Sequence, residues 1–152
     1  MNDEILMWYD GSCEPCNPGG YASYGVLIKH NGVTIFSESK LVGHGQGMSN
    51  NVAEYSGLLR GLQWLLNNGY RKNKIVIRGD NMMTVMQTAG KWRARKGFYI
   101  PYFQKVRDIK SNFKKIDIAW IPREQNGEAH ELSKRVLIDE KVEFRIQRIY
   151  NG

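Results

Sequence analysis

Three acidic residues, Asp10, Glu54 and Asp80, are spaced so that a fold could bring their carboxylates together. We expect Asp10 to end a strand over 5–10, and Asp80 to end a strand over 74–80. If these strands are parallel neighbours, both carboxylates emerge at the same edge of the sheet, where open α/β sheets bind ligands. Three carboxylates without a basic partner repel one another, and a divalent cation such as Mg²⁺, which takes oxygen ligands, removes that repulsion. Together with the cationic surface described below, the three acids predict metal-assisted cleavage of a phosphodiester.

Each acid also has an ordinary structural explanation. Asp10 and Gly11 form a common turn pair, Asp80 could cap the helix that follows it, and Glu54 could be a favourable acid in the first turn of a helix. The helical stripe of Glu54 continues through Leu58, Gly61 and Leu65. This spacing places Glu54 beside the sheet-facing side of its helix rather than directly in water.

The elements that must position these acids follow from apolar periodicity. Further strands are expected over 21–30, 33–42 and 115–121, with Asn31 and Gly32 as a two-residue hairpin turn. Helices are expected over 52–66, 81–89, 101–113 and about 127–138. Asn50 or Asn51 would cap the first of these helices, and Gly69 would end it. The tail 141–150 alternates, which fits either a short strand or an arm.

This order of elements predicts an α/β fold. The first three strands form an antiparallel meander, and helical crossovers then add two parallel strands, which makes a mixed five-stranded sheet flanked by helices on both faces. The length of 152 residues and the 41% apolar content suit one compact domain, 1–152, whose tail begins at about 140.

The longest apolar runs are far shorter than the roughly 20 residues that span a bilayer. The acidic start "MNDEILMWYDG" does not resemble a signal peptide, so we expect a cytoplasmic protein without a membrane partner.

The charge balance favours a polyanionic partner. Lys and Arg number 22 against 15 Asp and Glu, a net charge of +7. The segment "KWRARKG" over 91–97 mixes four cations with an indole, and five more cations follow up to residue 115. Cations interleaved with aromatic rings suit a phosphate backbone that carries bases or sugars to stack on, whereas the alternative is a solvated face.

The two cysteines have the spacing C-x-x-C, but the sequence gives them no evident chemistry. The segment "NPGG" after Cys16 breaks the helix that a redox C-x-x-C usually opens. The three histidines are scattered and do not complete a zinc site. We therefore expect Cys13 and Cys16 to be ordinary thiols in a loop.

Four segments, taken in order and spacing, resemble ribonuclease H of type 1. They are "YDGSCEPCNPGG", "SNNVAEYSGLLRGL", "IRGDNMMTV" and "WIPREQNGEAHELS", and the resemblance covers nearly the whole chain. The "EPCNPGG" loop, the "PREQN" stretch and the tail bring it closest to the archaeal-type branch. The resemblance implies a ribonuclease H-like fold, in agreement with the sheet predicted above. It also implies a sequence-nonspecific endonuclease that hydrolyses the RNA strand of RNA/DNA hybrids and leaves 5′-phosphate and 3′-hydroxyl ends.

The resemblance assigns roles to particular residues. Asp10, Glu54 and Asp80 match the first three catalytic carboxylates, which hold two divalent ions, Mg²⁺ or Mn²⁺, and Asp10 would bridge them. Trp92 resembles the aromatic residue of the substrate-binding protrusion, and packing in the core is the alternative for its indole. The candidate substrate-binding residues are Gly11, Ser12, Asn17, Ser49, Asn50, Asn51, Trp92, Arg93, Arg95, Lys96 and Asn126. We expect the protein to act as a monomer.

Two positions depart from the family pattern. Met82 stands where many members carry a glutamine that contacts the hybrid, which puts that contact in doubt. His130 occupies the position of the fourth catalytic carboxylate in the family motif N-x-x-A-D-x-L. We expect His130 to lie in the active site at the second metal, with a solvated histidine as the alternative. Because Mn²⁺ accepts nitrogen ligands more readily than Mg²⁺ does, His130 predicts a preference for Mn²⁺.

Three functions remain open at this point. The first is an active hybrid nuclease, and the second is a broader ribonuclease that also cuts double-stranded RNA. The third is a module that binds hybrid or double-stranded RNA and has lost cleavage together with the fourth carboxylate. The presence of the other three carboxylates favours an active enzyme, because decay of the site would be expected to remove them as well.

Overall fold

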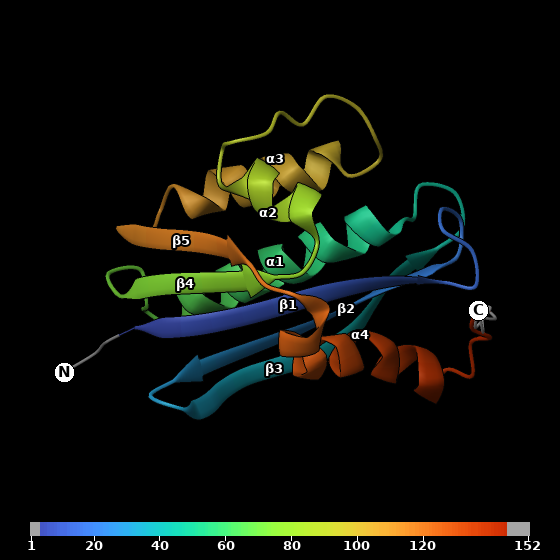
Figure 1. Ribbon diagram of the computed structural model, residues 1–152, viewed down its shortest axis with the longest axis horizontal. Coiled ribbons are helices and arrows are strands. Elements are labelled where there is room, and N and C mark those ends of the chain that lie inside the picture. Colours follow the sequence, from blue (N-terminus) through green and yellow to red (C-terminus); the bar gives the residue numbers. More distant parts are fainter. Residues whose placement is uncertain (1–3, 146–152) are drawn as a thin grey trace, which may run out of the picture.

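The computed structural model describes residues 4–145 as a five-stranded sheet with helices on both faces (Figure 1). In chain order the elements are β1 (Ile5–Glu14), β2 (Tyr21–His30), β3 (Val33–His44), α1 (Asn50–Asn67), β4 (Lys74–Gly79), α2 (Met82–Thr88), α3 (Ile100–Lys110), β5 (Lys115–Trp120) and α4 (Gly127–Asp139), with a short 3-10 turn over Arg123–Gln125 before α4. The strand order is β3-β2-β1-β4-β5. The meander β1–β3 is antiparallel, and β4 runs parallel to both β1 and β5. The predicted mixed sheet is confirmed.

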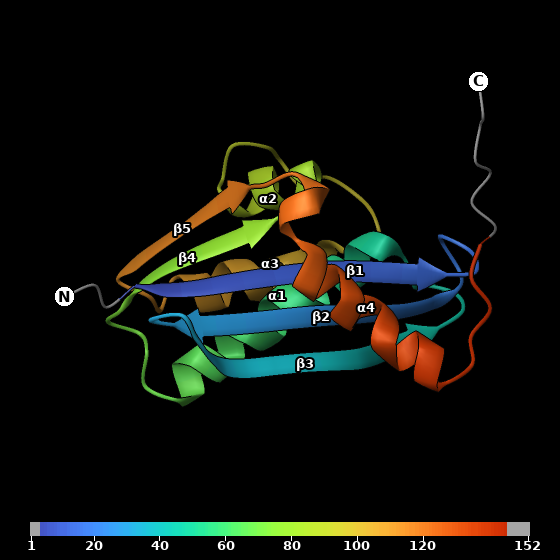
Figure 2. The ribbon, with the colours of Figure 1, turned by 60° about the horizontal axis from the view of Figure 1, so that its bottom comes forward.

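The helices form two layers around this sheet. Figure 2 shows α4 crossing in front of β1 and β2, with α1 and α3 behind the sheet. The largest apolar cluster lies between the sheet and α1 and α3, because the apolar stripe of α1 faces the strands. Its fully buried members include Ile5, Met7, Ile75 and Ile77 from the strands and Leu58, Leu62 and Leu65 from α1. Within residues 4–145, no helix has the length and apolarity that a membrane crossing requires.

The parallel pairing of β1 with β4 brings two of the acids to one place. The last pair in this ladder is Trp8 with Arg78, and Asp10 and Asp80 each lie two residues further along the chain. The prediction that Asp10 ends its strand was wrong, since β1 continues to Glu14. The strand continues because β2 pairs with it along its whole length. Asp10 therefore lies inside a strand, at the point where that strand loses its β4 partner.

Two glycines allow helices to approach the sheet closely on either side of Asp10. A Cβ atom at Gly11 would lie 2.5 Å from the backbone nitrogen of Glu54, so β1 packs directly against the N-terminal part of α1. Glu54 itself lies beyond the first turn of this helix, contrary to the expectation from the sequence. Gly25 pairs with Asp10 across the β1–β2 ladder. A Cβ atom at Gly25 would lie 2.4 Å from the carbonyl oxygen of Ala129 in α4. A side chain at either position would push a helix away from Asp10.

Several local predictions need correction. Ser49 caps α1, rather than Asn50 or Asn51, because its Oγ accepts a hydrogen bond from the backbone N–H of Val52 at 3.2 Å. Asn81, rather than Asp80, caps α2 through its side chain.

The other differences concern the cysteines and two segment ends. Cys13 is buried within β1, so the prediction of a loop was wrong for this residue, although Cys16 is exposed in the loop after the strand. The helix predicted to reach 113 ends at Lys110. The tail has no strand up to residue 145, and its remainder lies outside the described residues. The assignment of 1–152 to one domain stays a prediction.

The contact at Gly25 predicts a strong effect of a single methyl group. Gly25→Ala should destabilise the fold by about 1–3 kcal/mol, because the new Cβ atom collides with the backbone of α4. Gly127→Ala is the matched control, since it lies at the start of the same helix and its Cβ atom would meet no atom within 4 Å. Urea unfolding of the two variants checks this, and equal stabilities would contradict the close packing of α4 on β2.

Candidate active site

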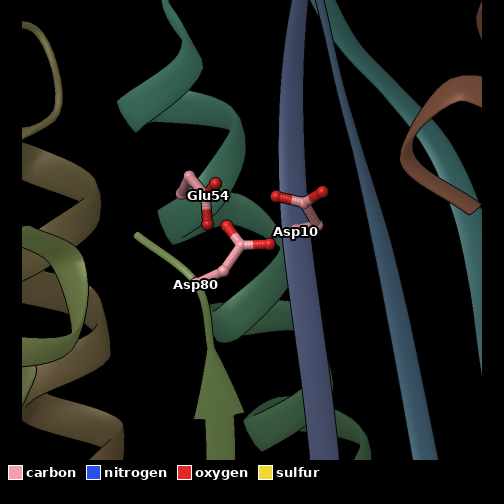
Figure 3. Close-up of side chains that lie close together, drawn as sticks. All are labelled: Asp10, Glu54 and Asp80. Carbon is pink, nitrogen blue, oxygen red and sulfur yellow. The ribbon is translucent and has the colours of Figure 1, made fainter. Parts of the chain in front are cut away.

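The carboxylates of Asp10, Glu54 and Asp80 point toward one another from three different elements (Figure 3). One oxygen from each side chain lies within 4.8 Å of the others. Asp10 and Glu54 are each only 1% exposed, and Asp80 is half-buried. Asp10 comes from the middle of β1, Glu54 from the first turns of α1, and Asp80 follows β4. The fold thus brings together the three acids that were predicted to meet.

These carboxylates repel one another in a place with little water. Two unit charges about 5 Å apart repel by roughly 3 kcal/mol at an effective dielectric constant near 20. Burial and the neighbouring charge of Asp10 raise the pKa of Glu54 well above its ordinary value. Burial and Asp10 also raise the pKa of Asp80. Without a bound metal ion, the carboxyl groups of Glu54 and Asp80 therefore keep their protons to a higher pH than usual.

The donor atoms fit a hard divalent cation. The Oε2 atom of Glu54 is buried and has no hydrogen-bond partner among the described residues. A buried carboxylate oxygen without a partner is costly, and a cation between the three acids would satisfy it. The three side chains offer only oxygen atoms, which are the ligands that Mg²⁺ prefers and Mn²⁺ also accepts.

His130 joins this cluster from the opposite face of the sheet. Its Nδ1 lies 2.9 Å from Oδ2 of Asp10, and its side chain is 33% exposed. The other oxygen of Asp10, Oδ1, accepts a hydrogen bond from the backbone N–H of Gly11 at 2.9 Å. His130 reaches Asp10 because Gly25, opposite Asp10 in the sheet, lets α4 approach. His130 is thus neither fully solvated nor remote from the acids.

Asp80 is held in place by two neighbours. The Nδ2 of Asn126 donates to Oδ2 of Asp80 at 3.2 Å and to the carbonyl oxygen of Tyr9 at 2.9 Å. The indole N–H of Trp120 donates to the carbonyl oxygen of Asp80 at 3.0 Å. Asn126 was predicted to bind substrate, but this residue is 1% exposed and donates to a carboxylate of the cluster. The contact of Trp120 was not predicted, because its position at the end of a strand carries no local signal for it.

The polar candidates near the start of α1 also gather at this end of the sheet. Asn17 accepts a hydrogen bond from the backbone N–H of Asn50 at 2.9 Å, which ties the β1–β2 loop to the helix. The Nδ2 of Asn81 donates to Oδ1 of Asn51 at 3.1 Å. Ser49 is occupied as the cap of α1.

Gly11 and Ser12 are buried beside the cluster. Gly11 provides room for α1, as described above. The hydroxyl groups of Ser12 and Ser133 lie 2.9 Å apart, so Ser12 connects β1 to α4. Both residues therefore have packing roles within the fold.

The cationic candidates lie apart from the carboxylates, beyond the far end of α2. Arg93, Arg95 and Lys96 are exposed in the loop between α2 and α3. Trp92 in the same loop is 47% exposed, so the alternative that it packs in the core was wrong. Since α2 begins just after Asp80 and ends at Thr88, this helix separates the basic loop from the acids.

The raised pKa of Glu54 predicts how stability depends on pH. A carboxyl group whose pKa is higher in the folded than in the unfolded state holds its proton longer when folded. Without metal, the wild-type protein should therefore lose stability as pH rises above the ordinary glutamate value of 4.5. Glu54→Gln should lose less, and should be the more stable protein at neutral pH. Urea unfolding in EDTA from pH 4 to 8 checks this. In a second series without EDTA, Mg²⁺ should stabilise the wild type but not the variant. Parallel curves for the two proteins would contradict the mutual repulsion.

Comparison with known proteins places this arrangement in a family. Residues 8–136 match the reverse transcriptase-like family. The bifunctional protein Rv2228c of Mycobacterium tuberculosis is 31% identical over 121 residues, which are 77% of this chain and 31% of that protein. The uncharacterized protein YpeP of Bacillus subtilis is 26% identical over 152 residues, which cover 99% of this chain and 66% of YpeP. The chain thus spans about a third of the length of the mycobacterial relative.

Solved structures agree with this assignment. LC11-RNase H1, isolated from compost, has a TM-score of 0.82 at 29% identity, over 91% of this chain and 99% of that one. The same enzyme in complex with an RNA/DNA hybrid has a TM-score of 0.80 at 28% identity, over 90% and 99% of the two chains. RNase H1 from Halobacterium salinarum shares the fold with a TM-score of 0.78 at 23% identity, over 90% and 98%. The chain therefore belongs to the reverse transcriptase-like family and has a ribonuclease H-like domain whose structural relatives are type 1 enzymes.

Proposed function

We propose that this protein is a ribonuclease H, an endonuclease that hydrolyses the RNA strand of RNA/DNA hybrids without sequence preference. It would leave 5′-phosphate and 3′-hydroxyl ends. The observation that carries the proposal is the convergence of Asp10, Glu54 and Asp80, with a buried oxygen of Glu54 that lacks a partner. The similarity to LC11-RNase H1, which was crystallised with an RNA/DNA hybrid, supports the choice of substrate.

The three acids would hold the divalent ions, Mg²⁺ or Mn²⁺, that the reaction needs. Bound metal ions would polarise the phosphoryl group of the substrate and activate the attacking water molecule. The protein itself aligns the carboxylates that would bind these ions. The backbone N–H of Gly11 orients one oxygen of Asp10, and Asn126 and Trp120 fix the side chain and the backbone of Asp80. These contacts hold the acids in place before a substrate arrives, which lowers the cost of organising the site.

The substrate would lie across polar and cationic groups on either side of the acids. The amides of Asn17, Asn50 and Asn51 suit the 2′-hydroxyl groups, base edges and phosphates of a minor groove. The exposed Trp92 and its neighbouring cations suit the backbone of a strand that continues past α2. Arg93, Arg95 and Lys96 would supply attraction that depends on salt concentration.

His130 would complete the site at the place of a fourth carboxylate. Its Nδ1 faces Asp10, which leaves Nε2 as the second ring nitrogen available to a metal, a water molecule or the substrate. An imidazole offers a nitrogen ligand without negative charge, so the enzyme would work better with Mn²⁺ than with Mg²⁺. The same substitution favours an alternative function, in which a weakened or inactive protein binds hybrid or double-stranded RNA.

Asp10→Asn should abolish cleavage and leave binding of the hybrid largely unchanged. The asparagine can still accept the hydrogen bond from Gly11, but it removes the charge that would hold both metal ions. Because phosphate contacts carry most of the affinity, the Kd in EDTA should change by less than about tenfold. Gel assays with a labelled RNA/DNA hybrid measure cleavage, and anisotropy measures binding. Asp117→Asn, on the exposed face of β5, is the matched control. Cleavage by Asp10→Asn at near the wild-type rate would refute the assignment of the acids.

Substitutions at His130 separate its two roles. If His130 is a weak metal ligand, His130→Asp should gain Mg²⁺-dependent cleavage, because an anionic oxygen replaces a neutral nitrogen. If the imidazole instead moves a proton or aids the departure of product, His130→Asp should lose rate with both metals. Initial rates with Mg²⁺ and Mn²⁺ distinguish these outcomes. Identical rates and metal preference in His130→Asp and His130→Ala would place the residue outside the chemistry.

A further inference from the structure

Helix α4 carries His130 to Asp10, yet it takes little part in the main apolar core. It lies across β1, β2 and β3 on the face opposite α1 and α3 (Figure 2). Among the described residues, none from 127–139 belongs to the apolar cluster between the sheet and α1 and α3. The buried apolar side chains of α4 are Ala129, Leu132 and Leu137. Apolar contacts have no preferred direction, so three such side chains do not by themselves fix the rotation and the axial position of a helix.

Serine hydroxyl groups from the sheet also bond to the backbone of α4. The hydroxyl of Ser23 in β2 donates to the carbonyl oxygen of Ser133 at 2.5 Å. The hydroxyl of Ser39 in β3 donates to the carbonyl oxygen of Leu132 and accepts from the backbone N–H of Val136 at 3.0 Å. These two backbone groups are four residues apart and pair with each other in a regular helix, so Ser39 binds one turn of α4 at both of its ends. Hydrogen bonds are directional, so these contacts fix the helix where apolar contacts would not.

Ser133 connects this turn to His130 and to the first strand. Its hydroxyl donates to the carbonyl oxygen of His130 at 2.6 Å and lies 2.9 Å from the hydroxyl of Ser12 in β1. A hydroxyl group carries one proton, so Ser12 is the donor in the second contact. Ser12, Ser23 and Ser133 are each at most 3% exposed, so water does not compete for these bonds. We call Ser12, Ser23, Ser39 and Ser133 the serine cluster.

The sheet places the serine cluster beside Asp10. Asp10, Gly25 and Ser39 are neighbours across β1, β2 and β3. Ser12 and Ser23 form a pair two residues away along β1 and β2, which puts them on the same face of the sheet. Gly25 therefore lets α4 come close, and the hydroxyl groups around it determine where on the sheet the helix rests.

The contact of His130 with Asp10 depends on this placement. The side chain of His130 is 33% exposed, and its Nδ1 lies 2.9 Å from Oδ2 of Asp10. An ionised carboxylate only accepts hydrogen bonds, so Nδ1 carries the proton in this contact. Because an α-helix rises by about 1.5 Å per residue, a slide of α4 by the rise of a single residue would break the contact.

We propose that the serine cluster positions His130 for its role beside the acids, by fixing the turn of α4 that follows this residue. The four serines act through the backbone of α4, which makes them positioning residues for the imidazole. The effect on cleavage rests on the proposed function, whereas the placement of the imidazole does not.

Nitrogen NMR of isotope-labelled histidine rings tests the placement without any cleavage. Spectra are recorded in alkaline EDTA buffer, which keeps imidazole rings neutral. The chain has three histidines, so His130→Ala identifies the signals of His130. In the wild type these signals should show the proton on Nδ1, because the carboxylate of Asp10 selects that tautomer. Ser39→Ala and Ser133→Ala should move them toward a mixture of the two tautomers. Ser39→Thr keeps the hydroxyl group on an edge strand and should restore the wild-type signals.

Ser111→Ala is the matched control. Its hydroxyl also donates to a carbonyl oxygen three residues earlier, that of Asp108 at 2.6 Å, but it lies at the end of α3. The signals of His130 should not change in this variant, and thermal melts followed by circular dichroism check that each variant is folded. A lower melting temperature with unchanged His130 signals in Ser39→Ala and Ser133→Ala would overturn the proposal, because the serines would then support only the fold. Equal changes in Ser111→Ala would overturn it as well.

Cleavage of a labelled RNA/DNA hybrid then relates the placement of His130 to the chemistry. Ser39→Ala and Ser133→Ala should lower kcat by about tenfold or more, since a displacement of about 1 Å in a site is costly. The KM should stay within about twofold, because other groups hold the hybrid. Ser39→Thr should keep the wild-type kcat. An unchanged kcat in variants whose His130 signals have moved would overturn the proposal. If the wild type cleaves no hybrid, the proposed function fails, and the spectra still decide whether the serine cluster places His130.

Discussion

The mutual repulsion of three carboxylates in a place shielded from water is the constraint on which this structure depends. Asp10 lies in β1, Glu54 in α1 and Asp80 directly after β4, so the three charges are fixed by different parts of the fold. Burial and the charge of Asp10 raise the pKa of both Glu54 and Asp80. The fold holds these groups together at a cost in stability, as is common where a site is organised for a metal ion or a substrate.

The packing around Asp10 shows how the fold meets this constraint. Gly11 lets the N-terminal part of α1 lie against β1, and Gly25 lets α4 lie against β2 on the other face. The first contact brings Glu54 to Asp10, and the second brings His130 to Asp10. A sheet with ordinary side chains at both glycines would hold the two helices further away, and the acids and the histidine would not meet.

The cationic surface is organised separately from the acids. The helix α2 starts beside Asp80 and ends at the basic loop, so one short helix sets the spacing between the carboxylates and the cations. Buried Gln87 accepts a hydrogen bond from Tyr55 in α1 and holds the loop through two others, to Arg93 and Tyr99. This separation is physically favourable, because cations placed next to the acids would neutralise the charge that a metal ion needs. A long polyanion such as a nucleic acid could contact both regions at once.

Much of the site could be predicted from the sequence, because strand and helix patterns report which side of its own element a residue faces. The mixed sheet and the three acids follow from such patterns, whereas the basic segment around Trp92 follows from the clustering of its cations along the chain. The continuation of β1 beyond Asp10 could not be predicted, because a neighbouring strand decides it through backbone hydrogen bonds. Only the tertiary structure decided that His130 touches Asp10, that Trp120 holds Asp80, and that α2, α3 and their loop enclose a cavity. These contacts join residues far apart in the chain, and they depend on how closely the elements pack, which local periodicity does not encode.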